Sequence, residues 1–182
     1  RNRILRFLAP VVVALLLHAP HFALGRADLN FDFFIHYNWA KDFADSVAAG
    51  NWYPRWTFEA RFGLGEPAFL FYSPVYYMLT AALAGAGLSV WASMHVVEVV
   101  SAVVVGAVVF RLGRHYLNEP RSLLLACVAM ANPFMVMLNY KFNGFAWGSV
   151  GCVFHALLAY ALLRPGAMDR VFNGLAIFAV AG

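Results

Sequence analysis

A run of apolar residues from Val90 to Phe110 constrains the fold of this chain most strongly, because it is long enough to cross a membrane as a helix. Similar runs cover residues 4–24, 122–138 and 146–163, and a further run from residue 171 reaches the last residue. Of all residues 63% are hydrophobic and only 12% are charged, which leaves too little polar surface for a soluble domain. The sequence therefore predicts an all-α fold, that of a polytopic α-helical membrane protein.

Basic residues at the ends of the apolar runs indicate which loops face the cytoplasm. They lie in the N-terminal segment, between residues 111 and 121, and between residues 164 and 170. One more apolar stretch, residues 69–88, would place two of these basic loops on the opposite side if it crossed the membrane. Its phenylalanines and tyrosines instead suit a helix that lies along the membrane surface.

The topology that follows has a cytoplasmic N-terminus and a large extracytoplasmic loop over residues 25–89. The expected spans are residues 4–24, 90–110, 122–138, 146–163 and a truncated 171–182. The chain begins at Arg1 and ends inside an apolar run, so we expect residues 1–182 to be a single N-terminal fragment of a membrane domain. The basic residues serve topology in this interpretation, so the expected partner is the lipid bilayer and no nucleic acid is expected.

The large loop contains six of the nine acidic residues of the chain, which are Asp28, Asp32, Asp42, Asp45, Glu59 and Glu66. Residues 32–49 lack proline and glycine and are followed by Gly50, which predicts a helix that ends at a glycine. Asp32 and His36 would then lie on one face of this helix, four residues apart. Asp42 and Asp45 are expected on its solvated face, and the turn-rich residues that follow predict an irregular connection.

Four motifs follow one another along this loop: Asp32-Phe-Phe-Ile-His36, Gly50-Asn-Trp-Tyr-Pro-Arg-Trp56, Gly63-Leu-Gly-Glu-Pro67 and Phe71-Tyr-Ser-Pro-Val-Tyr-Tyr77. With these motifs the chain resembles, from about residue 3 to residue 163, the bacterial membrane proteins labelled "6-pyruvoyl-tetrahydropterin synthase-related". Those proteins are similar to the GT-C superfamily of integral-membrane glycosyltransferases. The chain departs from many such proteins at residues 143–147, where they carry a glutamate and this sequence has none.

The resemblance implies a GT-C-like enzyme of a prokaryotic cytoplasmic membrane. Its first extracytoplasmic loop would contain juxtamembrane helices and an essential acidic residue. The implied donor is a polyprenyl-phosphate-linked sugar, and the acceptor is a glycan, lipid or protein of the cell envelope.

Such a transfer needs a base for the acceptor hydroxyl and a cationic group near the departing phosphate. With the resemblance, Asp32 is the candidate catalytic base, and His36 would orient it or share a ligand. A carboxylate that only stabilises the start of its helix is the alternative. Asp28 and Asp32 together are candidate ligands of a divalent metal ion, which prefers oxygen atoms. No further cofactor follows from the sequence.

Three basic residues are candidates for binding the phosphate, namely Arg55, Arg61 and Lys141, and the guanidinium of Arg55 in its aromatic setting ranks first. The alternative is that these side chains reach toward lipid headgroups. Trp56 and Tyr72 are candidates for stacking on a sugar, although aromatic residues also anchor proteins at membrane surfaces.

Glu98 and His95 lie inside the apolar run 90–110, where ionisable residues usually face a protein interior or a water-filled cavity. This pair would either border the active site or form a polar contact between helices.

The sequence thus predicts a membrane glycosyltransferase that acts on the extracytoplasmic side. A transporter or flippase of lipid-linked substrates is one alternative, although the apolar runs carry few charges for such a role. A non-catalytic membrane scaffold is the other, and the glutamate missing near Trp147 favours it.

Overall fold

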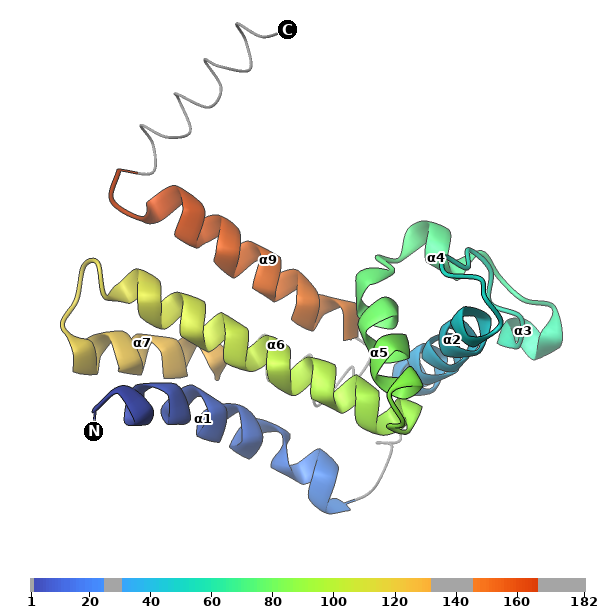
Figure 1. The fold of residues 1–182 in the computed structure, drawn as a ribbon, viewed down its shortest axis with the longest axis horizontal. Coiled ribbons are helices and arrows are strands. Elements are labelled where there is room, and N and C mark those ends of the chain that lie inside the picture. The colour runs from blue at the N-terminus through green and yellow to red at the C-terminus, as the bar shows by residue number, and fades with distance from the viewer. Residues whose placement is uncertain (1, 25–30, 132–145, 167–182) are drawn as a thin grey trace, which may run out of the picture.

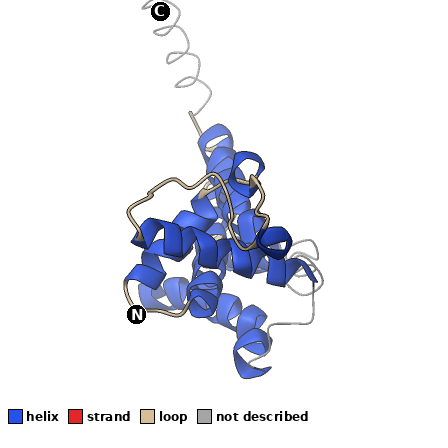
Figure 2. Cartoon of the chain, turned by 90° about the vertical axis from the view of Figure 1, so that its right-hand side faces the viewer, coloured by secondary structure: helices blue, strands red, loops and turns tan. Residues whose placement is uncertain are grey.

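The computed structural model describes residues 2–24, 31–131 and 146–166 (Figure 1). Its helices are α1 (Asn2–Leu24), α2 (Phe31–Ala48), α3 (Ala60–Gly63), α4 (Ala68–Phe71), α5 (Val75–Gly85), α6 (Val90–Gly113), α7 (Glu119–Met130) and α9 (Ala146–Leu163). Within these residues the β-structure is limited to one isolated bridge between Thr57 and Glu66, and Figure 2 shows no strand. The all-α prediction is therefore confirmed.

The described helices form two parts. In the first, which we call the bundle, α6 packs against α1, α7 and α9. The second, which we call the cap, comprises residues 31–88 with helices α2 to α5, and it lies at one end of the bundle (Figure 1). Helix α5 joins the two parts, because it contacts α2 in the cap and α6 and α9 in the bundle.

Among the described residues, α6 alone is both long and apolar enough to cross a membrane. Its 24 residues extend about 36 Å at the usual rise of an α-helix. The helix begins after Ser89, whose side chain accepts a hydrogen bond from the backbone N–H of Ala92 at 3.1 Å and so caps the first turn. It continues past the predicted end at Phe110 to Gly113.

Helices also lie at the other predicted spans, as far as the structure describes them. Helices α1 and α9 cover the predicted residues 4–24 and 146–163, and among their described side chains the apolar segments are Leu8–Ala19 and Val150–Leu163. Helix α7 covers the first part of the predicted span 122–138; the remainder and the predicted span 171–182 lie outside the described residues. Membrane crossing by these segments stays a prediction.

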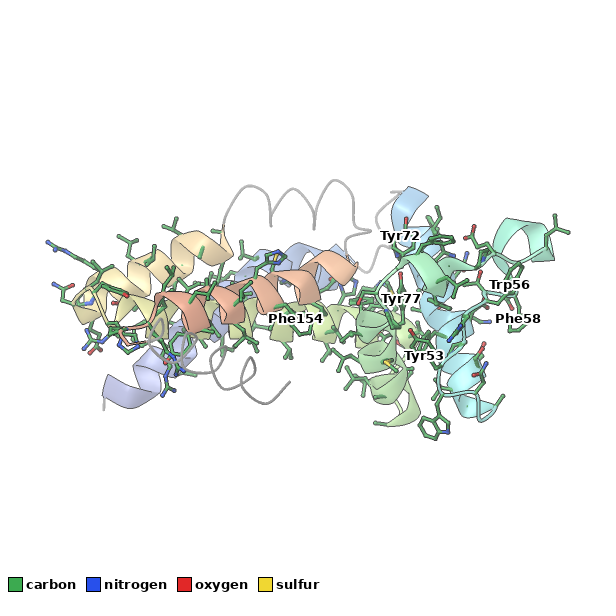
Figure 3. The ribbon with its side chains drawn as sticks, turned by 90° about the horizontal axis from the view of Figure 1, so that it is seen from above. Tyr53, Trp56, Phe58, Tyr72, Tyr77 and Phe154 are labelled. Atoms are coloured by element: carbon green, nitrogen blue, oxygen red, sulfur yellow. The ribbon has the colours of Figure 1, made fainter. Side chains whose placement is uncertain are left out.

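The apolar stretch 69–88 forms two short helices instead of one long one. Helix α4 ends at Phe71, and Pro74 directly precedes α5, because proline suits the start of a helix and not its interior. The 11 residues of α5 extend about 16 Å, whereas the hydrocarbon core of a bilayer is about 30 Å thick. Helix α5 also crosses the end of α6 steeply instead of running along it (Figure 1, Figure 3). Its length agrees with the expectation that this stretch does not cross the membrane.

The end of the bundle opposite the cap is basic. Helix α1 begins there, the loop between α6 and α7 turns there, and α9 ends there (Figure 1). The hydroxyl of Tyr116 donates a hydrogen bond to the carbonyl of Leu163, and the rings of His115 and Tyr160 lie 6.0 Å apart, so the loop contacts the end of α9. This basic end contains Arg111, Arg114, Arg121 and Arg164.

Three bundle helices approach one another closely at Gly106 of α6. A Cβ atom at this position would lie 2.3 Å from Sδ of Met130 in α7 and 3.3 Å from Cβ of Pro10 in α1. Met130 is fully buried, so its side chain has little room to yield. The missing side chain at Gly106 therefore permits this three-helix contact.

Candidate functional site

Helix α2 carries the first of the predicted site residues. It spans Phe31–Ala48, so the predicted helix is confirmed. Gly50 follows its end with a positive φ of 92°, and the N–H of Gly50 donates a hydrogen bond to the carbonyl of Val47. Asp32 lies in the first turn, and His36 follows one turn later. The side chain of Asp32 and the whole of Asp28 lie outside the described part of the structure.

His36 is buried and forms a short hydrogen bond to a tyrosine of α5. Its Nδ1 lies 2.6 Å from the hydroxyl of Tyr77. Burial, and next the neighbouring Tyr72, raise the pKa of Tyr77 well above its usual range, so the phenol keeps its proton. The protonated phenol can donate to Nδ1 of a neutral imidazole, which then carries its own proton on Nε2.

Three aromatic rings surround this imidazole. Trp39 and Tyr72 meet it edge-on, with centroid distances of 5.0 Å and 5.9 Å, and Tyr77 is stacked with it at 6.3 Å. We call these four side chains the His36 cluster. Tyr72 is the exposed member of this cluster, whereas Tyr77 is buried beneath it. Figure 3 shows both tyrosines at the cap end, together with Tyr53, Trp56 and Phe58, while Phe154 lies along the bundle.

Asp42 is buried, so its predicted place on a solvated face is wrong. One oxygen, Oδ2, accepts hydrogen bonds from the backbone N–H groups of Phe58 and Glu59 at 2.9 Å and 3.0 Å. The carboxylate therefore fixes the connection after α2 to the middle of that helix. Asp45 is exposed, as predicted, and its hydrogen bond to Lys41, followed by that of Glu59, raises the pKa of the lysine.

The irregular connection between α2 and α4 is held in place at several points. Backbone hydrogen bonds of 2.9 Å and 3.1 Å join Thr57 and Glu66, and Nε1 of Trp39 donates to Oε1 of Glu66 at 2.9 Å. Gly65 has a φ of 73°, and a Cβ there would lie 2.0 Å from Nε1 of Trp56. The absence of a side chain at Gly65 thus leaves the space that the indole of Trp56 occupies.

Among the described residues, no contact joins a predicted phosphate-binding residue to the His36 cluster. Arg55 is exposed, and its guanidinium carbon lies 5.9 Å from the centroid of the Tyr53 ring. Arg61 belongs to α3, but its side chain is outside the described part, and so is the whole of Lys141. The half-exposed indole of Trp56 remains available at the surface for stacking.

The predicted pair in α6 is buried and extends to a tyrosine of the cap. Nδ1 of His95 lies 3.1 Å from Oε2 of Glu98, and the hydroxyl of Tyr76 donates to Oε1 of the same carboxylate at 3.4 Å. Trp91 covers the imidazole of His95 at a centroid distance of 4.4 Å. We call Tyr76, His95 and Glu98 the α5–α6 polar cluster. This cluster forms a polar contact between α5 and α6, which is one of the two alternatives predicted for Glu98 and His95.

Comparisons of this chain with family models, curated proteins and solved structures found no match. Within residues 2–24, 31–131 and 146–166, no group of three His, Cys, Asp or Glu residues could hold a metal ion. Because Asp28 is outside these ranges, the metal site with Asp32 stays a prediction.

Sequence reasoning did not identify Trp39, Asp42 and Tyr77 as parts of the site. Trp39 follows His36 by three residues on the same helix, so its spacing was a usable signal. Asp42 and Tyr77 bind partners that lie 16 and 41 residues away in the sequence, and no local pattern indicates them.

The arrangement as a whole provides a buried, hydrogen-bonded imidazole at His36, an exposed aromatic edge at Tyr72, and an acidic residue at the start of α2. A buried imidazole that is already hydrogen bonded is suited to orienting a neighbouring group. The role of Asp32, one turn away on the same helix, as the base stays a prediction.

Proposed function

We propose that this chain belongs to a polytopic membrane glycosyltransferase whose cap lies on the extracytoplasmic side of a prokaryotic cytoplasmic membrane. The observation that supports the proposal is that the two ends of the bundle differ in charge and composition. Three basic segments meet at one end, and the aromatic, acidic cap covers the other (Figure 1). Short cytoplasmic loops collect arginine and lysine, so this polarity supports one orientation in the membrane. The motif resemblance then supplies the reaction class.

In this proposal the sugar comes from a polyprenyl-phosphate donor and goes to an acceptor of the cell envelope. Asp32 accepts the proton of the acceptor hydroxyl while that oxygen bonds to the anomeric carbon, and the bond from this carbon to the phosphate oxygen breaks. Arg55 holds the departing phosphate, and Trp56 and Tyr72 stack on the sugar. A divalent ion on Asp28 and Asp32 would add charge stabilisation at the phosphate.

A transporter of lipid-linked substrates is the second candidate, and the α5–α6 polar cluster favours it. A carboxylate and an imidazole buried in a membrane-spanning helix are typical of substrate or proton pathways. Among the described helices α6 is the one that carries such a pair, whereas a transport path needs polar groups in several spans.

Labelling of single cysteines tests the orientation. In a variant whose native Cys127 and Cys152 are replaced by serine, we expect Ala86→Cys in the cap to react with a membrane-impermeant maleimide in intact cells. Leu117→Cys at the basic end should react only after the membrane is opened. Both side chains are at least partly exposed, so access and not burial decides the result. Labelling of Leu117→Cys from outside would reverse the proposed topology.

Reconstitution tests the reaction itself. The complete protein in liposomes is supplied with a panel of polyprenyl-phosphate sugars on the outer leaflet and with envelope extracts as acceptors. Transfer of labelled sugar into acceptor supports the glycosyltransferase. Movement of the intact labelled lipid between leaflets, without transfer, would instead establish the transporter.

A further inference from the structure

Helix α5 of the cap lies between α2 and the bundle helix α6, and two successive tyrosines of α5 reach these two helices. Tyr76 and Tyr77 point in directions about 100° apart around the helix axis. Tyr76 reaches Glu98 of α6, and Tyr77 reaches His36 of α2. Both side chains are completely buried, and their rings meet edge to face at a centroid distance of 5.5 Å.

On the α6 side, the polar groups of Glu98 and His95 are costly to bury unless they have hydrogen-bond partners. Glu98 and His95 have relative exposures of 5% and 1%, so water contributes little to their solvation. Their mutual hydrogen bond and the hydroxyl of Tyr76 supply polar partners in its place. The present rotation of α5 brings the hydroxyl of Tyr76 to 3.4 Å from Oε1 of Glu98, where it adds a polar partner for the buried carboxylate.

The rotation of α5 also decides where Tyr77 lies. Since the two tyrosines share one rigid helical turn, a rotation that removes Tyr76 from Glu98 removes Tyr77 from His36 as well. The hydrogen bond between His36 and Tyr77 is short, at 2.6 Å, and therefore sensitive to a small displacement.

We infer that Glu98 and His95 are positioning residues for His36. They hold Tyr76, and through the rigid turn of α5 they fix Tyr77 against the imidazole in α2. The geometric part of this inference is independent of the proposed function, and only its effect on turnover rests on that function.

Histidine-selective NMR of the complete protein in nanodiscs tests the geometric part. The His36→Gln variant assigns the proton signal of the short hydrogen bond, which should lie far downfield. We expect Tyr76→Phe, which removes one oxygen and keeps the ring, to shift or abolish that signal, and Glu98→Gln to shift it. Glu59→Gln is the matched control, because this cap carboxylate pairs with Lys41 on an exposed surface, and it should leave the signal in place.

An unchanged signal in Tyr76→Phe would overturn the inference, whether or not Glu98→Gln folds. If the wild type shows sugar transfer, Tyr76→Phe should lower kcat on the order of tenfold with KM unchanged, since the binding groups remain and only their alignment is lost. A wild type without transfer would overturn the proposed function, and the NMR result would still decide the positioning role.

Discussion

Replacing Asp32 by asparagine should lower the rate of sugar transfer by on the order of 100- to 10,000-fold, the usual contribution of a general base. Asparagine has nearly the same shape, and it replaces a single residue in the first turn of an 18-residue helix, so the helix should form as before. What it lacks is a basic oxygen for the proton of the acceptor hydroxyl. The measurement is transfer of labelled sugar by reconstituted protein at saturating donor.

Asp45→Asn is the matched control for this experiment. Asp45 lies on the same helix, is exposed, and pairs with Lys41 at 3.2 Å. The same chemical change there should leave turnover within about a factor of two, because an exposed ion pair contributes little. Equal activities of Asp32→Asn and wild type would remove Asp32 from the mechanism, and a carboxylate that only stabilises its helix would explain the residue.

Asp42→Ala should loosen the connection between α2 and α4. A hydrogen bond to a charged group contributes about 1.5–3 kcal/mol, and Oδ2 of Asp42 accepts two, from Phe58 and Glu59. Without them the connection should open more often, and trypsin should cut after the exposed Arg55 at least about tenfold faster than in the wild type. Mass spectrometry of the digest identifies the cut.

Because both hydrogen bonds end on Oδ2 of Asp42, a second substitution can serve as a control with an intermediate effect. In Asp42→Asn the amide oxygen can replace Oδ2 and accept from both N–H groups, so cleavage should be intermediate. Asp45→Ala removes only an exposed ion pair and should leave the cleavage rate unchanged. A rate in Asp42→Ala equal to that of the wild type would show that the connection is held by other contacts, such as the bridge between Thr57 and Glu66.

Helix positions were predictable because their signals are local. The end of α2 follows from Gly50, which can adopt a positive φ, and the break before α5 follows from Pro74. The gathering of the basic loops at one end follows from the charge of short segments next to apolar runs. Each of these signals lies within a few residues of the structure it determines.

The site was less predictable because its contacts are distant in sequence. Asp42 looked like a solvated residue, since spacing on α2 does not reveal that a later loop folds back over it. Glu98 was correctly singled out as an ionisable residue in an apolar run, but its partner Tyr76 comes from another helix. A hydrogen bond between His36 and Tyr77 requires α2 and α5 to pack side by side, and this depends on the cap core as a whole.

At the contact around Gly106, the residues at positions 106 and 130 compete for the same space between α6 and α7. The sulfur of Met130 occupies the space that a methyl group at position 106 would fill. A larger residue at 106 is thus compatible with this crossing only if the side chain at position 130 moves or becomes smaller. Oxidation of the methionine adds an oxygen atom to the same sulfur and so increases the demand for space at this contact.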